Sequence, residues 1–369
     1  MRTIVAVVIC VLLAVPVGAS ASGGSAGPLL RRAAKLSGLP VRRPVATATV
    51  AGSRYDVLLA RALSRDYPSA LQRIDTTLYT RLGLINHSVK GRPPASRAWY
   101  DPSEHKLLLR RTPMPGQALV VNELVRALVD QNYGLGRVVG LRSRDRDRAL
   151  AAKAIVDGTA ALASGLHASP LSGTPLERFQ QLEVSAGLGP GRALAAELRY
   201  LGGRAALATA LRTFPQTTEQ LLHVDKFLER EPALPVRLPS RIGDATLTAS
   251  ETFGELDVRS LLQAFGIPDA ATIAAGWGGG RLVLYTSGEE STAALVLRWD
   301  TTDDAAEWRD AVGRYVAAAF PGAGMHECPP LDRCWSGTTE LAAGVLGETS
   351  VFASGPGSQA AAAALLHQP

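Results

Sequence analysis

The stretch VVNELVRALVDQNYGL, residues 120–135, decides the fold of this chain. Apolar residues recur at helical spacing from residue 117 to residue 131, so a helix is predicted there. Glu123 lies within this apolar pattern, with Asn122 beside it and Arg126 one turn later. Positions 122 and 126 are four residues apart and face the same way on a helix. These side chains therefore decide whether the helix carries chemistry or serves only as scaffold.

A strand–turn–strand segment is predicted directly before this helix. Residues 99–100 and 106–109 form its strands, and Asp101-Pro102 starts the turn between them. Gly and Pro separate further helical patterns at the expected boundaries. These patterns cover residues 52–80, 147–165, 175–187, 191–211 and 217–229. Residues 30–239 are therefore predicted to form a mainly helical domain.

The pattern changes near residue 240. Three prolines, Pro232, Pro235 and Pro239, indicate a stiff connection between two domains. The elements predicted beyond them are a helix at 255–265, paired strands in RLVLYTS and TAALVLRWD, a helix at 303–319, paired strands in ELAAGVLG and TSVFASG, and a closing helix in SQAAAAALLHQ. Helices alternating with hairpins predict an α+β fold with helices on one face of an antiparallel sheet. Residues 240–369 are therefore predicted to form a smaller α+β domain.

Composition indicates a globular chain of two domains. Its 369 residues exceed what one core usually fills, and 46% are hydrophobic and 20% charged. A formal net charge of +6 would suit a polyanionic partner. The basic residues are scattered, however, and the densest run, Arg142 to Arg148, alternates with Ser and Asp. This run is interpreted as a solvated face or loop, and no nucleic-acid partner is predicted.

The N-terminus has the charged, apolar and small-residue order of a secretory signal peptide. Ala19-Ser20-Ala21 predicts cleavage after Ala21, which gives a signal peptide at residues 1–21 and a flexible leader at 22–29. Ile9 precedes Cys10 in the middle of the apolar run, so a lipid-modified cysteine is not expected. The chain is therefore predicted to be exported, without lipidation and without a stable transmembrane span after cleavage.

Two cysteines, Cys328 and Cys334, remain after the signal peptide. In an oxidising compartment they are predicted to form one local disulfide, and two free buried thiols are the alternative. The loop between them is short, so the bond is expected to shape a loop rather than to hold the fold.

Several segments, taken in order, resemble a family of bacterial secreted or lipoprotein metallopeptidase-like proteins. They are YDPSEHKLLLRR (100–111), LVVNELVRALVDQNYGL (119–135), AIVDGTA (154–160), FPQTTEQLLHVDKFLEREPALPVRLP (214–239) and AAGWGGGRLVLY (274–285). In that pattern a Tyr-Asp-Pro hairpin leads to His-Glu-Leu-x-His-Ala-Leu-x-Asp-Gln, and a Glu-Gly-Asp-Ala helix supplies the third zinc ligand. The resemblance covers about residues 30–310 and implies a zincin-like fold for the helical domain.

Carried over residue by residue, the resemblance implies a degenerate metal site. Glu123 holds the general-base position, Asn122 and Arg126 stand at the first two ligand positions, and Asp157 stands at the third. Thr159 replaces the Asp that follows the glycine. Arginine keeps its proton and cannot donate a lone pair to zinc, and an amide oxygen is a poor zinc ligand. No cofactor is therefore predicted, and zinc enters only if other residues supply the ligands.

The remaining candidates have alternative structural roles. His223 and Tyr133 are candidates for a binding groove, and His223 lies where the family also carries His. Packing or capping is the alternative for His223, and Glu123 could be an ordinary helix-face carboxylate. His105 falls in the hairpin turn and is expected to be solvated.

The sequence thus predicts an exported, non-catalytic metallopeptidase-like protein that binds a peptide or an envelope component, or has a structural role at the cell envelope. One alternative is an active secreted zinc metallopeptidase with atypical ligands. Another is an envelope polyanion-binding module. With zinc absent, Arg126 is expected to form a bidentate salt bridge with Asp157 in its place and to reach Glu123 or Asn122.

Overall fold

The computed structural model describes residues 27–85 and 96–368. The predicted signal peptide, 1–21, lies outside the described residues, as does most of the predicted leader. Its last three residues, 27–29, are helical, because the first helix begins at Gly27. Within the described ranges, no helix is long and apolar enough to cross a membrane.

The first part of the chain is mainly helical and carries a small sheet. Its elements are α1 (Gly27–Ser37), β1 (Ala46–Val50), α2 (Gly52–Asp66), α3 (Ser69–Arg81), β2 (Ala98–Asp101), β3 (Lys106–Arg110), α4 (Gln117–Tyr133), η1 (Leu135–Arg137), α5 (Arg146–Ser164), α6 (Pro175–Val184), η2 (Ser185–Gly187), α7 (Pro190–Thr213), α8 (Thr218–Leu222) and α9 (Val224–Glu229). The small sheet has the order β1-β3-β2, with β1 parallel and β2 antiparallel to β3. The helical pattern over residues 52–80 forms two helices, α2 and α3, and Pro68 is the N-cap of the second.

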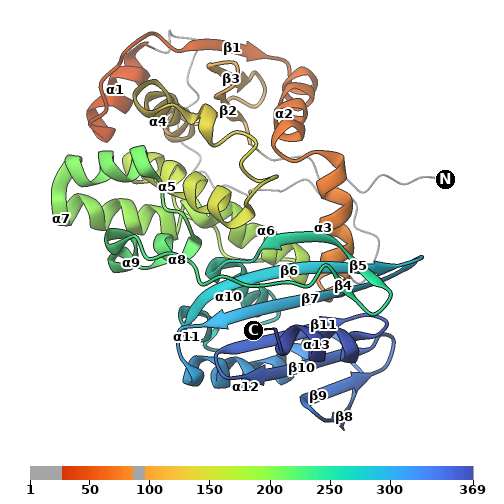
Figure 1. Cartoon of the computed structure of the whole chain (residues 1–369). Helices are drawn as coiled ribbons and strands as arrows, with labels where there is room; N and C mark the ends of the chain where they lie inside the picture. Colours follow the sequence, from red (N-terminus) through yellow and green to blue (C-terminus); the bar gives the residue numbers. More distant parts are fainter. Residues whose placement is uncertain (1–26, 86–95, 369) are drawn as a thin grey trace.

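The second part is built on an antiparallel sheet of eight strands. Its elements are β4 (Arg241–Ile242), β5 (Ala245–Thr252), α10 (Glu255–Ala264), α11 (Ala270–Ala275), β6 (Trp277–Ser287), β7 (Glu290–Trp299), α12 (Thr302–Ala319), β8 (Gly324–Cys328), β9 (Leu331–Ser336), β10 (Leu341–Leu346), β11 (Thr349–Ser354) and α13 (Ser358–Leu366). The strand order is β4-β5-β6-β7-β11-β10-β9-β8. The protein is therefore α+β, as predicted, and Figure 1 shows the helical part above this sheet.

Helices cover both faces of the large sheet, so the prediction of helices on one face is wrong. Alternate residues of β6 point to opposite sides, since a strand has a period of two. Leu282 belongs to the core that contains Trp308 of α12. Val283 belongs to a second core that contains Leu365 of α13. The strands are accordingly apolar on both faces, which is typical of a sheet enclosed between two layers.

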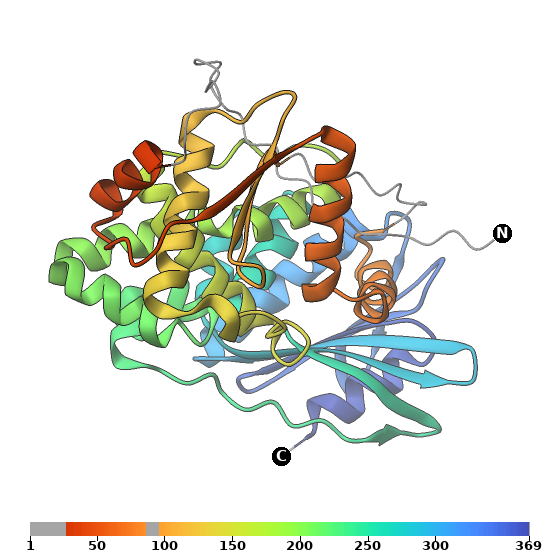
Figure 2. The ribbon, with the colours of Figure 1, turned by 90° about the horizontal axis from the view of Figure 1, so that it is seen from above.

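The core of the sheet domain extends into the helical part. Leu78 and Tyr79 of α3, together with Phe179 of α6, are buried in the same cluster as the helices and strands of the second half. The hydroxyl of Tyr315 donates a hydrogen bond of 2.6 Å to the carbonyl of Leu82. Packing therefore joins the two predicted domains into one body. Between them, the proline-rich connection runs along the outside of the molecule (Figure 2).

Cys328 and Cys334 form the predicted disulfide, with an S–S distance of 2.04 Å. The bond joins the end of β8 to β9 at the edge of the large sheet. It closes a local loop, as the sequence spacing predicts.

Two glycines let α5 and α7 approach backbone to backbone. A Cβ on Gly158 would lie 2.1 Å from the carbonyl carbon of Gly191, and a Cβ on Gly191 would lie 2.0 Å from the carbonyl oxygen of Ala154. No side chain fits at either position. The glycine of AIVDGTA therefore sets the distance between these helices, and so fixes the position of Asp157 beside it.

Gly158→Ala is expected to destabilise the protein by about 3 kcal/mol, since the added methyl group would collide with backbone that has little room to move. Gly136→Ala is the matched control, because a Cβ there would have no heavy atom within 4 Å. Urea unfolding should show a loss for Gly158→Ala and a change within about 0.5 kcal/mol for Gly136→Ala. Equal stability of both variants would contradict the close helix packing.

Candidate functional site

The hairpin β2–β3 and the helix α4 are joined by two buried carboxylates. Glu123 Oε2 accepts a hydrogen bond of 2.8 Å from the backbone N–H of Tyr100. Asp130 Oδ2 accepts one of 2.6 Å from the Tyr100 hydroxyl and lies 2.7 Å from His105 Nδ1. Asp130 Oδ1 accepts one of 2.7 Å from the N–H of Leu135. The two carboxylates therefore fix the hairpin on the helix, and His105, although half exposed, is partnered.

Arg126 lies between two carboxylates, and its predicted ion pair with Asp157 is confirmed. Arg126 Nε is 3.1 Å from Asp157 Oδ1, and Arg126 Nη1 is 3.2 Å from Glu123 Oε2. The predicted bidentate pair does not form, because neither Arg126 Nε nor Asp157 Oδ1 takes part in a hydrogen bond. The other oxygen of Asp157 accepts a hydrogen bond of 2.6 Å from Lys153. The guanidinium also stands over the ring of Trp99, 4.9 Å from its centroid, which adds a cation–π contact.

Asn122 faces α5 but meets a different residue. Its Nδ2 donates a hydrogen bond of 3.3 Å to the hydroxyl of Ser164, while Arg126 meets Asp157. A later residue of α4 thus contacts an earlier residue of α5, so the two helices run in opposite directions. The four residues at the predicted metal-site positions thus lie along the seam between α4 and α5, and Arg126 contacts both Glu123 and Asp157.

Burial and charge act in opposite directions on these carboxylates. The side chains of Glu123, Arg126 and Asp157 are 6%, 12% and 17% exposed. Burial raises the pKa of Glu123. This effect exceeds the lowering caused by Arg126 and by the N–H of Tyr100. For Asp157, burial is outweighed by Arg126 and Lys153, and the pKa is lowered. Asp157 is therefore held as an anion by its cations.

The residues at these positions do not fit zinc. A metal bound by residues 122, 126 and 157 would require a lone pair from Arg126, and a guanidinium has none to give. The two carboxylates face the guanidinium itself. Glu123 shares its oxygens between Arg126 and the N–H of Tyr100, so both are engaged in holding the fold.

The proposed groove residues His223 and Tyr133 have structural contacts. His223 Nε2 lies 3.0 Å from Glu255 Oε1 of α10, which raises the pKa of His223 through the hydrogen bond with that carboxylate. Tyr133 is the last residue of α4 and packs partly buried against the helical core. The structure therefore places His223 in a contact between the two halves of the chain.

A second side-chain cation lies among three carboxylates. Lys226 Nζ is 2.5 Å from Glu219, 3.1 Å from Glu231 and 2.7 Å from Asp300. The three carboxylates are close enough together to hold a metal ion. The ammonium group already occupies the space between them and offsets part of their charge, so this cluster is an ion-pair network that joins α8, α9 and the end of β7. The sequence feature that could have indicated this network is the pair of opposite charges, Glu219 and Lys226, in two consecutive short helices.

The run from Arg142 to Arg148 was expected to be a solvated face or loop, but part of it is buried. Arg146 is 1% exposed and forms ion pairs with Glu183 of α6 and Asp257 of α10. Asp147 is fully buried and accepts a hydrogen bond of 3.0 Å from the N–H of Thr218. Partners far away in the sequence decide which residues of the run are buried, and no local pattern reveals them.

A cleft of about 360 Å³ lies between the helical part and the large sheet. Its walls come from the start of α5, the start of α8, the connection and the strands β5 and β6. The lining residues are Asp145, Asp147, Arg148, Gln216, Thr217, Gln220, Arg230, Pro232, Ala233, Leu234, Pro235, Val236, Thr252, Gly280 and Arg281. The three arginines form no ion pair within the described residues, so the cleft offers positive charge and a mixed polar and apolar surface.

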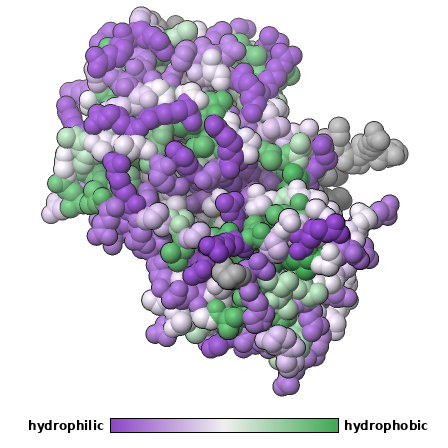
Figure 3. All heavy atoms as spheres, viewed as in Figure 1, coloured by the Kyte–Doolittle hydropathy of each residue, from purple (hydrophilic) through white to green (hydrophobic). Residues whose placement is uncertain are grey.

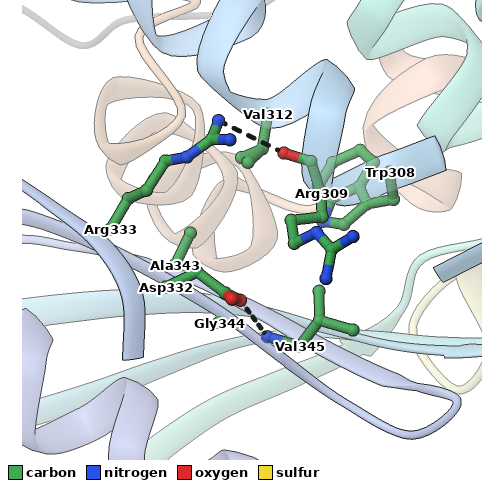
Figure 4. A pocket seen from close by; sticks show the side chains of 8 residues that line it. All are labelled: Trp308, Arg309, Val312, Asp332, Arg333, Ala343, Gly344 and Val345. Carbon is green, nitrogen blue, oxygen red and sulfur yellow. Dashed lines mark hydrogen bonds between the residues drawn. The ribbon is translucent and has the colours of Figure 1, made fainter. Parts of the chain in front are cut away.

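A smaller cavity between α12 and the sheet is no ligand site. Its volume is about 10 Å³, at or below the space that one water needs. Figure 4 shows its walls, where Asp332 accepts a hydrogen bond of 2.6 Å from the N–H of Val345 and Arg333 donates one of 3.5 Å to the carbonyl of Arg309.

A family model matches the second part of the chain. Residues 241–363 match the family model described as a domain of unknown function (DUF8575). The match covers the sheet domain and excludes the cluster of Glu123, Arg126 and Asp157. No curated protein matches the chain. No solved structure matches it either.

Arg126→Ala is expected to destabilise the protein by about 3 kcal/mol, because it leaves Glu123 buried without its cation and leaves Asp157 with the half-exposed Lys153 alone. Lys153→Ala is the matched control: Lys153 pairs with the same Asp157, but its side chain is 46% exposed, so a loss under about 1 kcal/mol is expected. Adding Asp157→Asn to Arg126→Ala should recover part of the stability. Urea unfolding tests all three variants, and equal losses for Arg126→Ala and Lys153→Ala would refute the role of Arg126.

Asp147→Asn is expected to change how stability depends on pH. Burial, with Asp257 nearby, raises the pKa of Asp147 to about 8. The folded protein then binds more protons than the unfolded chain between the two pKa values, so the free energy of unfolding falls as pH rises towards about 8. Asp147→Asn should flatten that fall, by up to about 1.4 kcal/mol per pH unit. Urea unfolding between about pH 5 and pH 8 measures it, and an unchanged slope would contradict the assignment.

Proposed function

We propose that the chain is an exported, non-catalytic metallopeptidase-like protein with a binding role at the cell envelope. The observation that carries this proposal is Arg126, a guanidinium paired with Glu123 and Asp157 at the positions where the resembled family binds zinc. A fixed cation there compensates the carboxylates that a metal would otherwise compensate. The order of residues at the N-terminus and the disulfide between Cys328 and Cys334 support export.

Loss of catalysis follows from the chemistry of this cluster. A metallopeptidase lowers the pKa of a bound water with its metal and removes a proton with a free carboxylate. Here the carboxylate of Glu123 accepts hydrogen bonds from Tyr100 and Arg126. Without a metal, this carboxylate alone would not generate a useful hydroxide.

The cleft between the two halves supports a binding role. It has about 360 Å³ of space, three arginines without ionic partners among the described residues, and an extended proline-rich wall. These features suit an extended ligand that carries a carboxylate, such as a peptide end. A rigid proline-rich wall also loses little entropy when a ligand binds.

The double variant Asn122→His/Arg126→His is expected to gain affinity for zinc, because Asp157 would then complete a set of two imidazoles and one carboxylate. The matched control, Asn122→His/Arg126→Ala, removes the same cation but supplies one imidazole. Zinc titration should show binding at least about tenfold tighter for the double-histidine variant, equivalent to ~1.4 kcal/mol. Metal analysis of the purified wild-type protein should find no stoichiometric zinc.

Two results would overturn the proposal in different ways. One equivalent of zinc in the wild-type protein, with peptide cleavage that Glu123→Gln and a chelator both abolish, would establish an active peptidase with atypical ligands. Failure of the double-histidine variant to bind zinc more tightly than its control would show that these positions do not have metallopeptidase geometry.

A further inference from the structure

One face of the helical part gathers basic side chains from three segments. They come from α1, from the loop after α1 and from the middle of α7, and all seven are exposed: Arg31, Arg32, Lys35, Arg42, Arg43, Arg199 and Arg204. The sequence of residues 27–45 and 195–206 contains one acidic residue, Glu197. Residues scattered along the sequence thus become one surface, which we call the basic face.

The three segments of the basic face are neighbours in space. A Cβ on Gly38, directly after α1, would lie 2.8 Å from Nε of Arg204 in α7. Figures 1 and 2 both place α1 and α7 on the same side of the molecule. Within the described residues none of the seven cations forms an ion pair. Arg32 and Arg42 instead reach amide oxygens, of Gln117 at 3.4 Å and of Asn132 at 3.0 Å. Their charges are therefore available to an external partner.

Exposed hydrophobic side chains lie among these cations. Tyr200 is 89% exposed and Leu201 55%, directly before the break in α7 at Gly202 and Gly203. Leu36 and Val41, at the end of α1 and in the loop after it, are 40% and 41% exposed. In Figure 3 a hydrophobic patch lies at the left edge, where Figure 1 draws α7, with hydrophilic side chains above it. The surface thus combines positive charge with apolar groups in contact with water.

We propose that the basic face docks the protein on a membrane surface that contains anionic lipids. Basic residues are attracted to the negative surface potential of such a membrane, and the attraction adds over several residues. Tyrosine and leucine gain from entering the boundary between headgroups and acyl chains. A soluble polyanion would satisfy the cations but leave Tyr200 and Leu201 in water, so a membrane fits the whole surface better. The inference concerns a different surface from the Arg126 cluster and does not depend on it.

Co-sedimentation of the mature chain with lipid vesicles tests the proposal. Binding is expected to phosphatidylcholine vesicles that contain about one third phosphatidylglycerol, to weaken as salt is added, and to be absent with phosphatidylcholine alone. Arg31→Glu/Arg32→Glu/Lys35→Glu should weaken binding about tenfold or more. The matched control, Arg54→Glu/Arg61→Glu/Arg73→Glu, makes the same change of net charge on α2 and α3 and should bind within about twofold of wild type. An equal loss of vesicle binding in both variants would show that net charge alone accounts for the binding, and would overturn the proposal.

A second variant separates the membrane from a polyanion. Tyr200→Ser/Leu201→Ser keeps every charge, so it should weaken vesicle binding several-fold while leaving the binding of soluble polyphosphate unchanged. Circular dichroism of each variant verifies that it is folded. If Tyr200→Ser/Leu201→Ser binds vesicles as tightly as the wild type does, and polyphosphate is bound equally tightly, the partner would be an envelope polyanion and not a membrane. Equal binding to neutral and anionic vesicles would overturn the proposal as well.

Discussion

One buried cation, Arg146, links the two halves of the chain beside the apolar core that they share. Its guanidinium extends from α5 to Glu183 of α6 and to Asp257 of α10, and both Arg146 and Asp257 are at most 1% exposed. The rings of Phe179 and Phe253 stand 5.9 Å from it. Charges buried to this degree are strongly unfavourable unless they are paired. Arg146 and Asp257 come from different halves of the chain, so moving the halves apart would leave each of these charges without its partner.

The same solution recurs at two other places. Arg126 pairs with Glu123 and Asp157 between α4 and α5, and Lys226 pairs with three carboxylates beside the large sheet. In each case a side chain supplies the positive charge where carboxylates from separate elements converge. A covalently attached cation needs no supply of metal ions and cannot be removed by a chelator. It also cannot act as a Lewis acid, so the arrangement favours stability over chemistry.

Periodicity in the sequence was sufficient for most individual elements. The helices α4 and α5, the hairpin β2–β3 and the strand pair β6–β7 follow from apolar spacing, and the disulfide follows from export and proximity. The ion pair between Arg126 and Asp157 followed from resemblance combined with charge compensation. By contrast, the parallel pairing of β1, the position of α13 and the burial of Arg146 depend on contacts between residues far apart in the sequence. No local pattern contains that information.

The packing of α3 and α6 against the sheet has a consequence for how the second half can be inherited. The region that matches DUF8575, residues 241–363, does not contain its whole core, because Leu78, Tyr79 and Phe179 pack into that core from outside. Tyr315 would also lose its partner, the carbonyl of Leu82. A gene rearrangement that carried only residues 241–363 into another protein would leave part of this core exposed to water. In a recipient chain, other apolar side chains would have to cover the face that α3 and α6 cover here.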